Sequence, residues 1–218
     1  GLTNENNSYI IALCAQMACL RTALEHPKSL FVGDELSVLL AKRGFAEIIG
    51  EQFATGRKEG ISIMILLQDL DAIINCSASA QILANRGITI TGLTRHGSTN
   101  AYIDHLNFPE EVINLNATDK YRQNRGEMFS RWLIERNGRF WDTRFYAPPM
   151  MLAALANNDE EKLARERIMA RYPQTQRGYL EGLKHFTDEY KAALLGTKSM
   201  KEIGLTDYQK HQLSRYRG

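Results

Sequence analysis

Leu30-Phe31-Val32-Gly33-Asp34-Glu35 places two adjacent carboxylates directly after a short apolar run. The run shows no polar alternation, which is typical of a strand buried on both faces of a parallel sheet. Ligands of open α/β sheets bind at the carboxyl ends of the strands, so this strand delivers its two acids to the place where chemistry is expected. Carboxylates there can hold Mg²⁺ and orient water, as nucleoside triphosphate hydrolysis requires. Any strand that simply ends in Asp-Glu fits the same pattern, so a purely structural role stays open at this point.

The chain on the carboxyl side of this strand continues in the pattern of an α/β sheet. A helical period covers residues 37–55, a β-branched strand is predicted at 61–67, a short helix at 77–85 and a third strand at 88–93. Strands and helices that alternate at these intervals indicate an open, mostly parallel sheet with crossover helices. The fold class is therefore α/β.

A second pattern begins after residue 126. Asn137-Gly138 lies between aromatic, strand-prone runs at 128–136 and 139–147, which predicts a β-hairpin. From Pro148 onward the sequence is helical and charged. We therefore expect an α/β body at 1–147 and a helical region at 148–218. Pro148-Pro149 opens a helix that contains Met150 and Leu155, and further helices are expected at 160–172, 178–195 and 206–216.

The amino-terminal part is expected to begin with a loop. Residues 3–8 are polar and rich in asparagine, and Ser8 is placed to cap a helix that ends before Pro27. The apolar runs here and at 61–67 are shorter than the roughly 20 residues that a membrane-spanning helix needs.

The composition excludes several classes of protein. The 218 residues are 44% hydrophobic and 24% charged, as in a globular chain with a real core. Net charge is +2, from 27 basic and 25 acidic residues, which is too balanced to indicate nucleic-acid binding, although a local basic face stays open. Three cysteines without a paired CxxC argue against a zinc site and for a reducing compartment.

Further polar residues follow the acidic pair in a definite order. Arg57-Lys58 comes at the end of the helix predicted over 37–55, and Gln68 comes at the end of the next strand. Because parallel strands end at the same edge of a sheet, Gln68 is expected beside Asp34, where an amide can contact a phosphate or water. The basic pair could instead simply complement a helix carboxyl terminus.

The order of these features resembles that in the C-terminal half of type IV secretion and conjugative transfer ATPases: an acidic pair, a helix, Gly-Arg-Lys, a strand and Gln. The resemblance spans roughly residues 29–172 and includes Asn-Arg-Gly-Ile-Thr-Ile at 85–90, the hairpin and Phe-Tyr-Ala-Pro-Pro at 145–149. It implies a partial RecA-like P-loop NTPase core with an α-helical C-terminal appendage. It also implies ATP and Mg²⁺ as cofactors, and a parent protein that powers channel assembly or substrate transfer.

The same resemblance implies roles for five residues. Asp34 would hold Mg²⁺ through water and Glu35 would activate the attacking water. Gln68 would sense the γ-phosphate. Arg57 would reach the nucleotide of a neighbouring subunit, and Lys58 would contact nucleotide beside it. The implied partners are further copies in a hexamer, other secretion-system ATPases and inner-membrane components, with a cytoplasmic location peripheral to the inner membrane.

The sequence departs from this family in one important respect. The phosphate-binding pattern G-x-x-x-x-G-K-[ST] is absent, and Gly-Thr-Lys-Ser at 196–199 lacks the Gly-Lys pair and the preceding strand. In the family the phosphate loop lies well before the acidic strand, and only 33 residues precede Asp34. We therefore expect a fragment that lacks the phosphate loop and hydrolyses no ATP by itself.

Two other functions stay open at this stage. The chain could be a non-catalytic docking module whose helical tail at 158–218 binds partners in a secretion machine. It could also belong to a DNA-translocating motor of the same superfamily, although the low net charge does not indicate nucleic acid. The hairpin carries four arginines that suit a solvated face, a subunit interface or phosphate sensing: Arg131, Arg136, Arg139 and Arg144. Its tryptophans, Trp132 and Trp141, suit packing within the hairpin or stacking on nucleic-acid bases.

Overall fold

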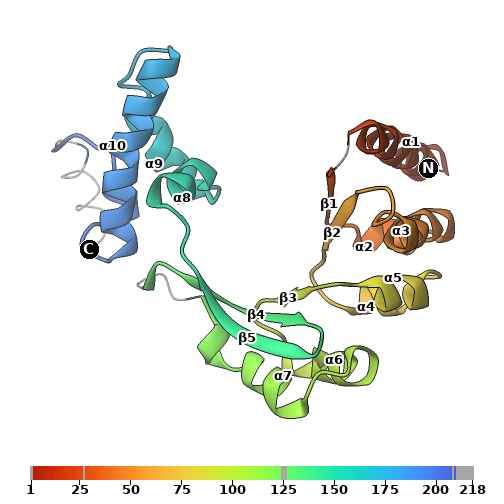
Figure 1. Cartoon of the computed structure of the whole chain (residues 1–218). Helices are drawn as coiled ribbons and strands as arrows, with labels where there is room; N and C mark the ends of the chain where they lie inside the picture. Colours follow the sequence, from red (N-terminus) through yellow and green to blue (C-terminus); the bar gives the residue numbers. More distant parts are fainter. Residues whose placement is uncertain (1, 27, 124–126, 208, 210–218) are drawn as a thin grey trace. The chain divides into compact units, whose positions relative to one another are not determined.

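A computed structural model describes residues 2–26, 28–123, 127–207 and 209. It shows a mixed α/β protein with a two-stranded parallel sheet and a three-stranded antiparallel sheet (Figure 1). The chain divides into two compact units, the first formed by residues 1–120 and 133–142 and the second by 121–132 and 143–218. The helical region expected from residue 148 thus lies in the second unit. Within the described ranges, no helix combines the length and the apolar character needed to cross a membrane.

The first unit contains the predicted parallel strand pair. Strand β1 (Leu30–Asp34) pairs with β2 (Ser62–Leu66), and Asp34 lies opposite Leu66. The connection contains α2 (Ser37–Leu40) and α3 (Arg43–Thr55) instead of one continuous helix. The helix predicted over 37–55 is interrupted because Lys42 adopts an extended backbone before α3 begins.

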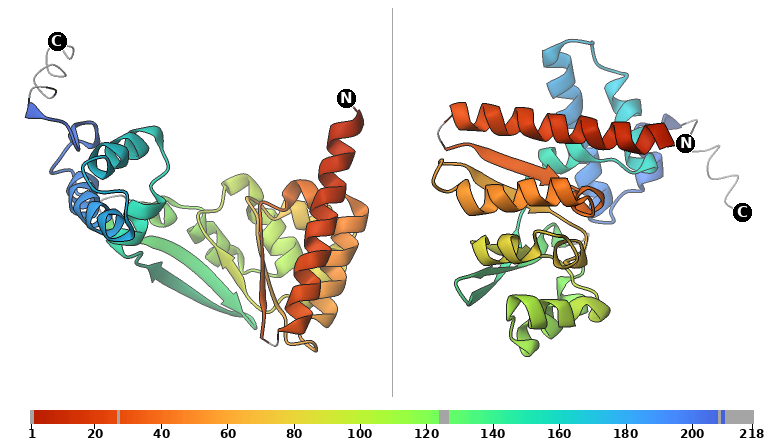
Figure 2. Two further views of the ribbon diagram at one scale, coloured as in Figure 1. Left: turned by 90° about the horizontal axis from the view of Figure 1, so that it is seen from above. Right: turned by 90° about the vertical axis from the view of Figure 1, so that its right-hand side faces the viewer.

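Helices cover one face of this parallel pair. Helix α1 (Leu2–Glu25) lies beside α3 in both views of Figure 2, and the buried amide of Gln16 donates to Gln52 Oε1 over 3.0 Å. The expectation that β1 is buried on both faces is wrong, since Leu30 is 61% and Val32 50% exposed. The described helices pack on one side only, and the sequence pattern of a strand does not report which neighbours are present.

The expected amino-terminal loop is also wrong. Residues 3–8 belong to α1, and Ser8 lies inside that helix instead of capping it. Helix propensities of asparagine and serine differ from those of better helix formers by only a few tenths of a kcal/mol. That difference is too small to stop a helix once its following turns have formed.

The sequence predicted that the third strand would extend the parallel sheet, and this prediction is wrong. Strand β3 (Thr89–Thr91) pairs antiparallel with β4 (Ser130–Arg136), Ile90 lying opposite Ile134. Two short helices separate it from β2, namely α4 (Asp71–Ile74) and α5 (Ser79–Asn85). The hairpin supplies an open edge that β3 joins, so the sheets are not mostly parallel.

The predicted hairpin is confirmed. Strand β4 is followed by Asn137 and Gly138, whose φ angles are 54° and 73°, and by β5 (Arg139–Phe145). Two consecutive positive φ angles define the tight turn that matches the twist of antiparallel strands. Helices α6 (Thr99–Leu106) and α7 (Glu110–Asn116) lie along one face of this sheet (Figure 1), and the short helical turns η1 (His96–Ser98) and η2 (Asp119–Tyr121) flank them.

The described residues of the second unit form mainly three helices and a short turn. Helices α8 (Pro149–Leu155), α9 (Asp159–Met169) and α10 (Gln176–Leu194), with the turn η4 (Met200–Glu202), enclose an apolar core. Asn158 and Thr175 cap α9 and α10 by accepting from the backbone N–H of the third residue of each helix, Glu161 and Gly178. The helix expected over 206–216 falls almost entirely on residues outside the described part of the chain.

Candidate functional site

The carboxyl ends of β1 and β2 bring together the acidic pair and the glutamine. Asp34 ends β1 opposite Leu66, and Gln68 follows β2 by two residues, so all three polar groups lie at one edge of the parallel pair. Asp34, Glu35 and Gln68 are exposed. We call this set, together with the exposed Asp69 and Asp71, the carboxyl edge.

Glu35 has an unusual backbone conformation at this edge. Its φ is 52°, in the left-handed region that costs a residue with a side chain roughly 1–2 kcal/mol. The turn lets the chain leave β1 sharply and bury Leu36 at the start of α2. Gly33 allows this packing, because a Cβ at that position would lie 2.4 Å from Leu36 Cδ1. Strained residues of this kind are concentrated at functional sites.

Replacing Glu35 by glycine is expected to raise the free energy of unfolding of the first unit by about 0.5–1 kcal/mol, since glycine adopts a positive φ without strain. Urea unfolding followed by Trp141 fluorescence, in a Trp132→Phe background, measures the change. Glu59→Gly is the matched control, because Glu59 is exposed and is not among the residues with positive φ. Equal destabilisation by both glycines would contradict strain at Glu35.

Arg57 and Lys58 lie at the opposite end of the strands. They occupy the turn between α3 and β2, where Ile61 N–H donates to Gly56 O over 2.8 Å. Ser62 N–H donates to Ser29 O, which places the start of β2 beside the start of β1. At about 3.3 Å per residue, the length of β1 separates this basic turn from Asp34 by roughly 13 Å. The structure therefore does not bring the two exposed cations to the carboxyl edge of their own chain.

A buried polar cluster adjoins the acids that follow β2. The hydroxyl of Tyr102 bonds to the side chains of Thr91 and Thr94, and Thr94 Oγ1 donates to Asn116 Oδ1 over 2.5 Å. Burial raises the pKa of Tyr102, and the carboxylates of Asp69 and Asp71 raise it further, against the lowering effect of its hydrogen bonds to the two threonines. Asn116 Nδ2 is buried without a partner among the described residues.

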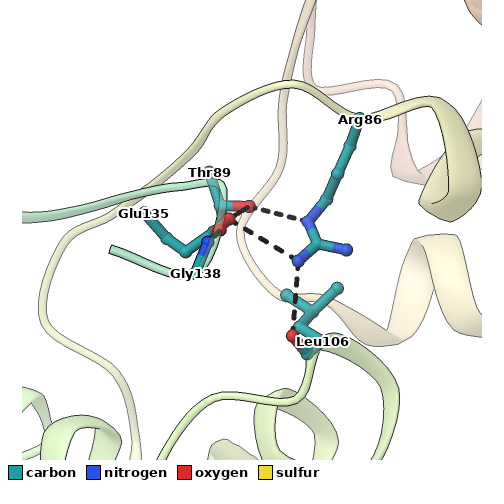
Figure 3. Close-up of polar contacts among 5 residues, drawn as sticks. All are labelled: Arg86, Thr89, Leu106, Glu135 and Gly138. Atoms are coloured by element: carbon teal, nitrogen blue, oxygen red, sulfur yellow. Dashed lines mark hydrogen bonds and ion pairs between the residues drawn. The ribbon is translucent and has the colours of Figure 1, made fainter. Parts of the chain in front are cut away.

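Figure 3 shows a second network, centred on Glu135 of the hairpin. Glu135 Oε2 lies 3.5 Å from Arg86 Nη2 and accepts from Thr89 Oγ1, and Oε1 accepts from Gly138 N–H over 2.9 Å. Arg86 also donates to Thr89 and to the carbonyl of Leu106 at the end of α6. One buried carboxylate thus ties β3, the hairpin turn and α6 together.

Sequence reasoning did not single out either network. Arg86 and Glu135 are 49 positions apart, and Thr94 and Asn116 are 22 apart. No local spacing links such pairs, because antiparallel pairing and helix packing bring them together. One local signal exists. Glu135 lies two residues after the apolar Leu133 in β4, so both side chains lie on the same, buried face of the strand.

The carboxyl edge suits a hard cation better than it suits a triphosphate. Within the described ranges, no three His, Cys, Asp or Glu side chains gather closely enough to hold a metal ion alone. Mg²⁺ does not require such a cage, because it usually binds one or two carboxylates and completes its shell with water and phosphate. The residues therefore fit Mg²⁺, whereas the sequence offers no loop of the kind that cradles the phosphates of ATP.

Two of the four hairpin arginines have a clear packing role. In the second unit, the guanidinium carbons of Arg131 and Arg144 lie 5.4 and 4.9 Å from the centre of the Phe129 ring. Both distances fall within the range of a cation–π interaction. Trp132 Nε1 donates to Ser130 Oγ, and Phe140 packs edge-on against Phe108 with ring centres 4.9 Å apart.

Comparison of this chain with protein families, curated proteins and solved structures finds no match.

Proposed function

We propose that this chain supplies the metal and water side of an ATP-hydrolysing site, as part of an ATPase of the type IV secretion and conjugation class. In this assignment Asp34 holds Mg²⁺ through water, Glu35 accepts a proton from the attacking water and Gln68 contacts the γ-phosphate. The phosphate-cradling loop comes from a segment outside these 218 residues. Arg57, with Lys58, contacts the nucleotide bound by a neighbouring copy in a ring. The free energy of ATP hydrolysis drives assembly of a secretion channel or transfer through it.

The observation that carries this proposal is the shared edge of β1 and β2. Parallel pairing puts an acidic pair and an amide at the carboxyl ends of adjacent strands, which is where α/β sheets bind ligands. The strained backbone of Glu35 is a second support. The distance between the basic turn and Asp34 fits a role for Arg57 in another copy's site and not in its own.

Protein docking is a second candidate function, and the second unit favours it. Several large apolar side chains of that unit are exposed to solvent. They come from the end of β5, from α8 and from α9: Phe145, Tyr146, Met150, Met151, Leu155 and Leu163. Exposed apolar side chains are available to bind other proteins, and methionine adapts readily to different partners.

Mn²⁺ can test the metal site in the chain as it stands. Mn²⁺ binds oxygen ligands as Mg²⁺ does, and its unpaired electrons broaden the NMR signals of nearby nuclei. We expect selective broadening of the amides of Asp34, Glu35 and Gln68, lost in Asp34→Asn. The doubly substituted Glu110→Gln, Glu111→Gln is the matched control, because it removes another exposed adjacent pair of acids in the first unit.

Broadening at the amides of Glu110 and Glu111 equal to that at the carboxyl edge would contradict a specific site. A steady-state assay adds an independent check, since the chain is expected to hydrolyse no ATP above background. Turnover that Glu35→Gln abolishes would show instead that a complete site exists within these 218 residues.

A further inference from the structure

One face of the three-stranded sheet is open in the first unit. Ile90 of β3 lies opposite Ile134 of β4, and Trp141 of β5 alternates onto the same face. Ile90 is 48% and Trp141 44% exposed, and Ile88, next to β3, is exposed as well. The other face carries Thr91 and Leu133, which are buried, and α6 and α7 lie along that side (Figure 1).

Two arginines border this open face at the hairpin turn. Arg136 ends β4 and Arg139 begins β5, and both are exposed. Neither forms an ion pair with any residue that the structure describes, in contrast to Arg86, which is held by Glu135. The acids of these strands lie on the covered side, where Asp142 pairs with Lys120 over 2.6 Å. The open face therefore combines an aromatic ring and aliphatic side chains with two free positive charges and no negative one.

We propose that this face binds single-stranded nucleic acid. Unstacked bases present flat apolar surfaces that pack on Trp141 and the isoleucines, and the two guanidinium groups pair with backbone phosphates. An anionic ligand is favoured because the border of the face is positive without a compensating acid. A single strand is favoured over a duplex because the apolar part of an open sheet can be used only by bases that are free to leave their stack.

The net charge of +2 does not conflict with this inference. Phosphate contacts depend on charges within about one Debye length, which is roughly 8–10 Å at physiological salt. The attraction of backbone phosphates to this face therefore depends on the nearby charges of Arg136 and Arg139 and not on the net charge of the chain. The proposal is independent of the ATPase assignment, since it uses none of the residues of the carboxyl edge.

Trp141 itself can report binding. The chain has two tryptophans, so Trp132→Phe leaves Trp141 as the single tryptophan, whose emission can be excited selectively over that of the tyrosines. We expect an oligo-dT of about 12 nucleotides to quench its emission. Two phosphate contacts on a single strand predict a salt slope of about −1.4, so affinity should fall about sevenfold between roughly 50 and 200 mM salt.

Variants separate the two components of the face. Arg136→Ala with Arg139→Ala should weaken binding and bring the salt slope close to zero. Arg21→Ala with Arg43→Ala is the matched control, because it removes two exposed arginines from helices of the same unit and should leave the slope unchanged. In a separate anisotropy assay with labelled oligo-dT, Trp141→Ala should weaken binding by roughly fivefold to 150-fold.

Three results would overturn the proposal. The first is the absence of quenching at low salt by oligo-dT, with circular dichroism showing that the chain is folded. The second is equal binding of duplex DNA of the same length, which would replace base stacking by simple charge attraction. The third is equally effective competition by polyglutamate, which would assign the face to an acidic protein partner.

Discussion

Phe186→Ala is expected to lower the free energy of unfolding of the second unit by about 4 kcal/mol, within the 3–5 kcal/mol range of buried Phe→Ala substitutions. Phe186 is fully buried in the core formed by α8, α9 and α10, and its ring lies 5.4 Å from that of Tyr190. The substitution removes a large apolar surface and leaves a cavity. Native-state hydrogen exchange of the α10 amides measures the loss in this unit specifically.

Leu180→Ala provides the control on the same helix. Leu180 is 49% exposed, so its truncation should change the exchange free energy by less than about 1 kcal/mol. A loss at Phe186 no larger than that at Leu180 would mean that α10 does not pack on this core.

Glu135→Ala is expected to destabilise the first unit by about 2–3 kcal/mol. The side chain accepts from Gly138 N–H and from Thr89, and it neutralises Arg86, so its removal leaves a mostly buried guanidinium without a counter-charge. Loss of one member of a fully buried ion pair costs about 3–5 kcal/mol. The Arg86 side chain is 25% exposed, which places the expected cost below that range. Urea unfolding followed by Trp141 in the Trp132→Phe background gives the value.

Glu47→Ala is the informative comparison. Glu47 lies only 2.7 Å from Arg43, closer than Glu135 lies to Arg86, yet both partners are largely exposed on α3. Exposed pairs are screened by water and contribute little, so the unfolding midpoint should stay nearly unchanged. If Glu47→Ala lowered the free energy of unfolding more than Glu135→Ala, the separation of the two charges and not their burial would determine the cost of losing an ion pair.

The sequence was sufficient for the features that local patterns control. Asn137-Gly138 defined the hairpin because few residues accept two consecutive positive φ angles. The two apolar runs located β1 and β2, and the polarity of a parallel pair then placed Asp34 and Gln68 at one edge. That part of the candidate site follows from strand direction alone and needs no side-chain contact.

Other features depend on neighbours that local patterns do not encode. The sequence of β1 indicated burial on both faces, but Leu30 and Val32 are exposed because the described helices pack on one side. β3 joined the hairpin instead of the parallel sheet for a similar reason, since the free edge of β4 competes for it. Helix α7 (Glu110–Asn116) was not predicted, because seven residues give too short a period to recognise. The partners of Tyr102 and Glu135 come from distant segments.

The uncharged stretch that contains β2 has a consequence for aggregation. From Ile61 to Gln68 the sequence carries no charge, and in the two-stranded sheet one edge of β2 is unpaired within the described residues. Apolar β-branched segments with a free backbone edge are templates for cross-chain pairing. The charges on either side, Arg57-Lys58-Glu59 and Asp69, stand where gatekeeper residues suppress such association. Neutralising Arg57 and Lys58 will therefore reduce solubility as well as any contact that they make.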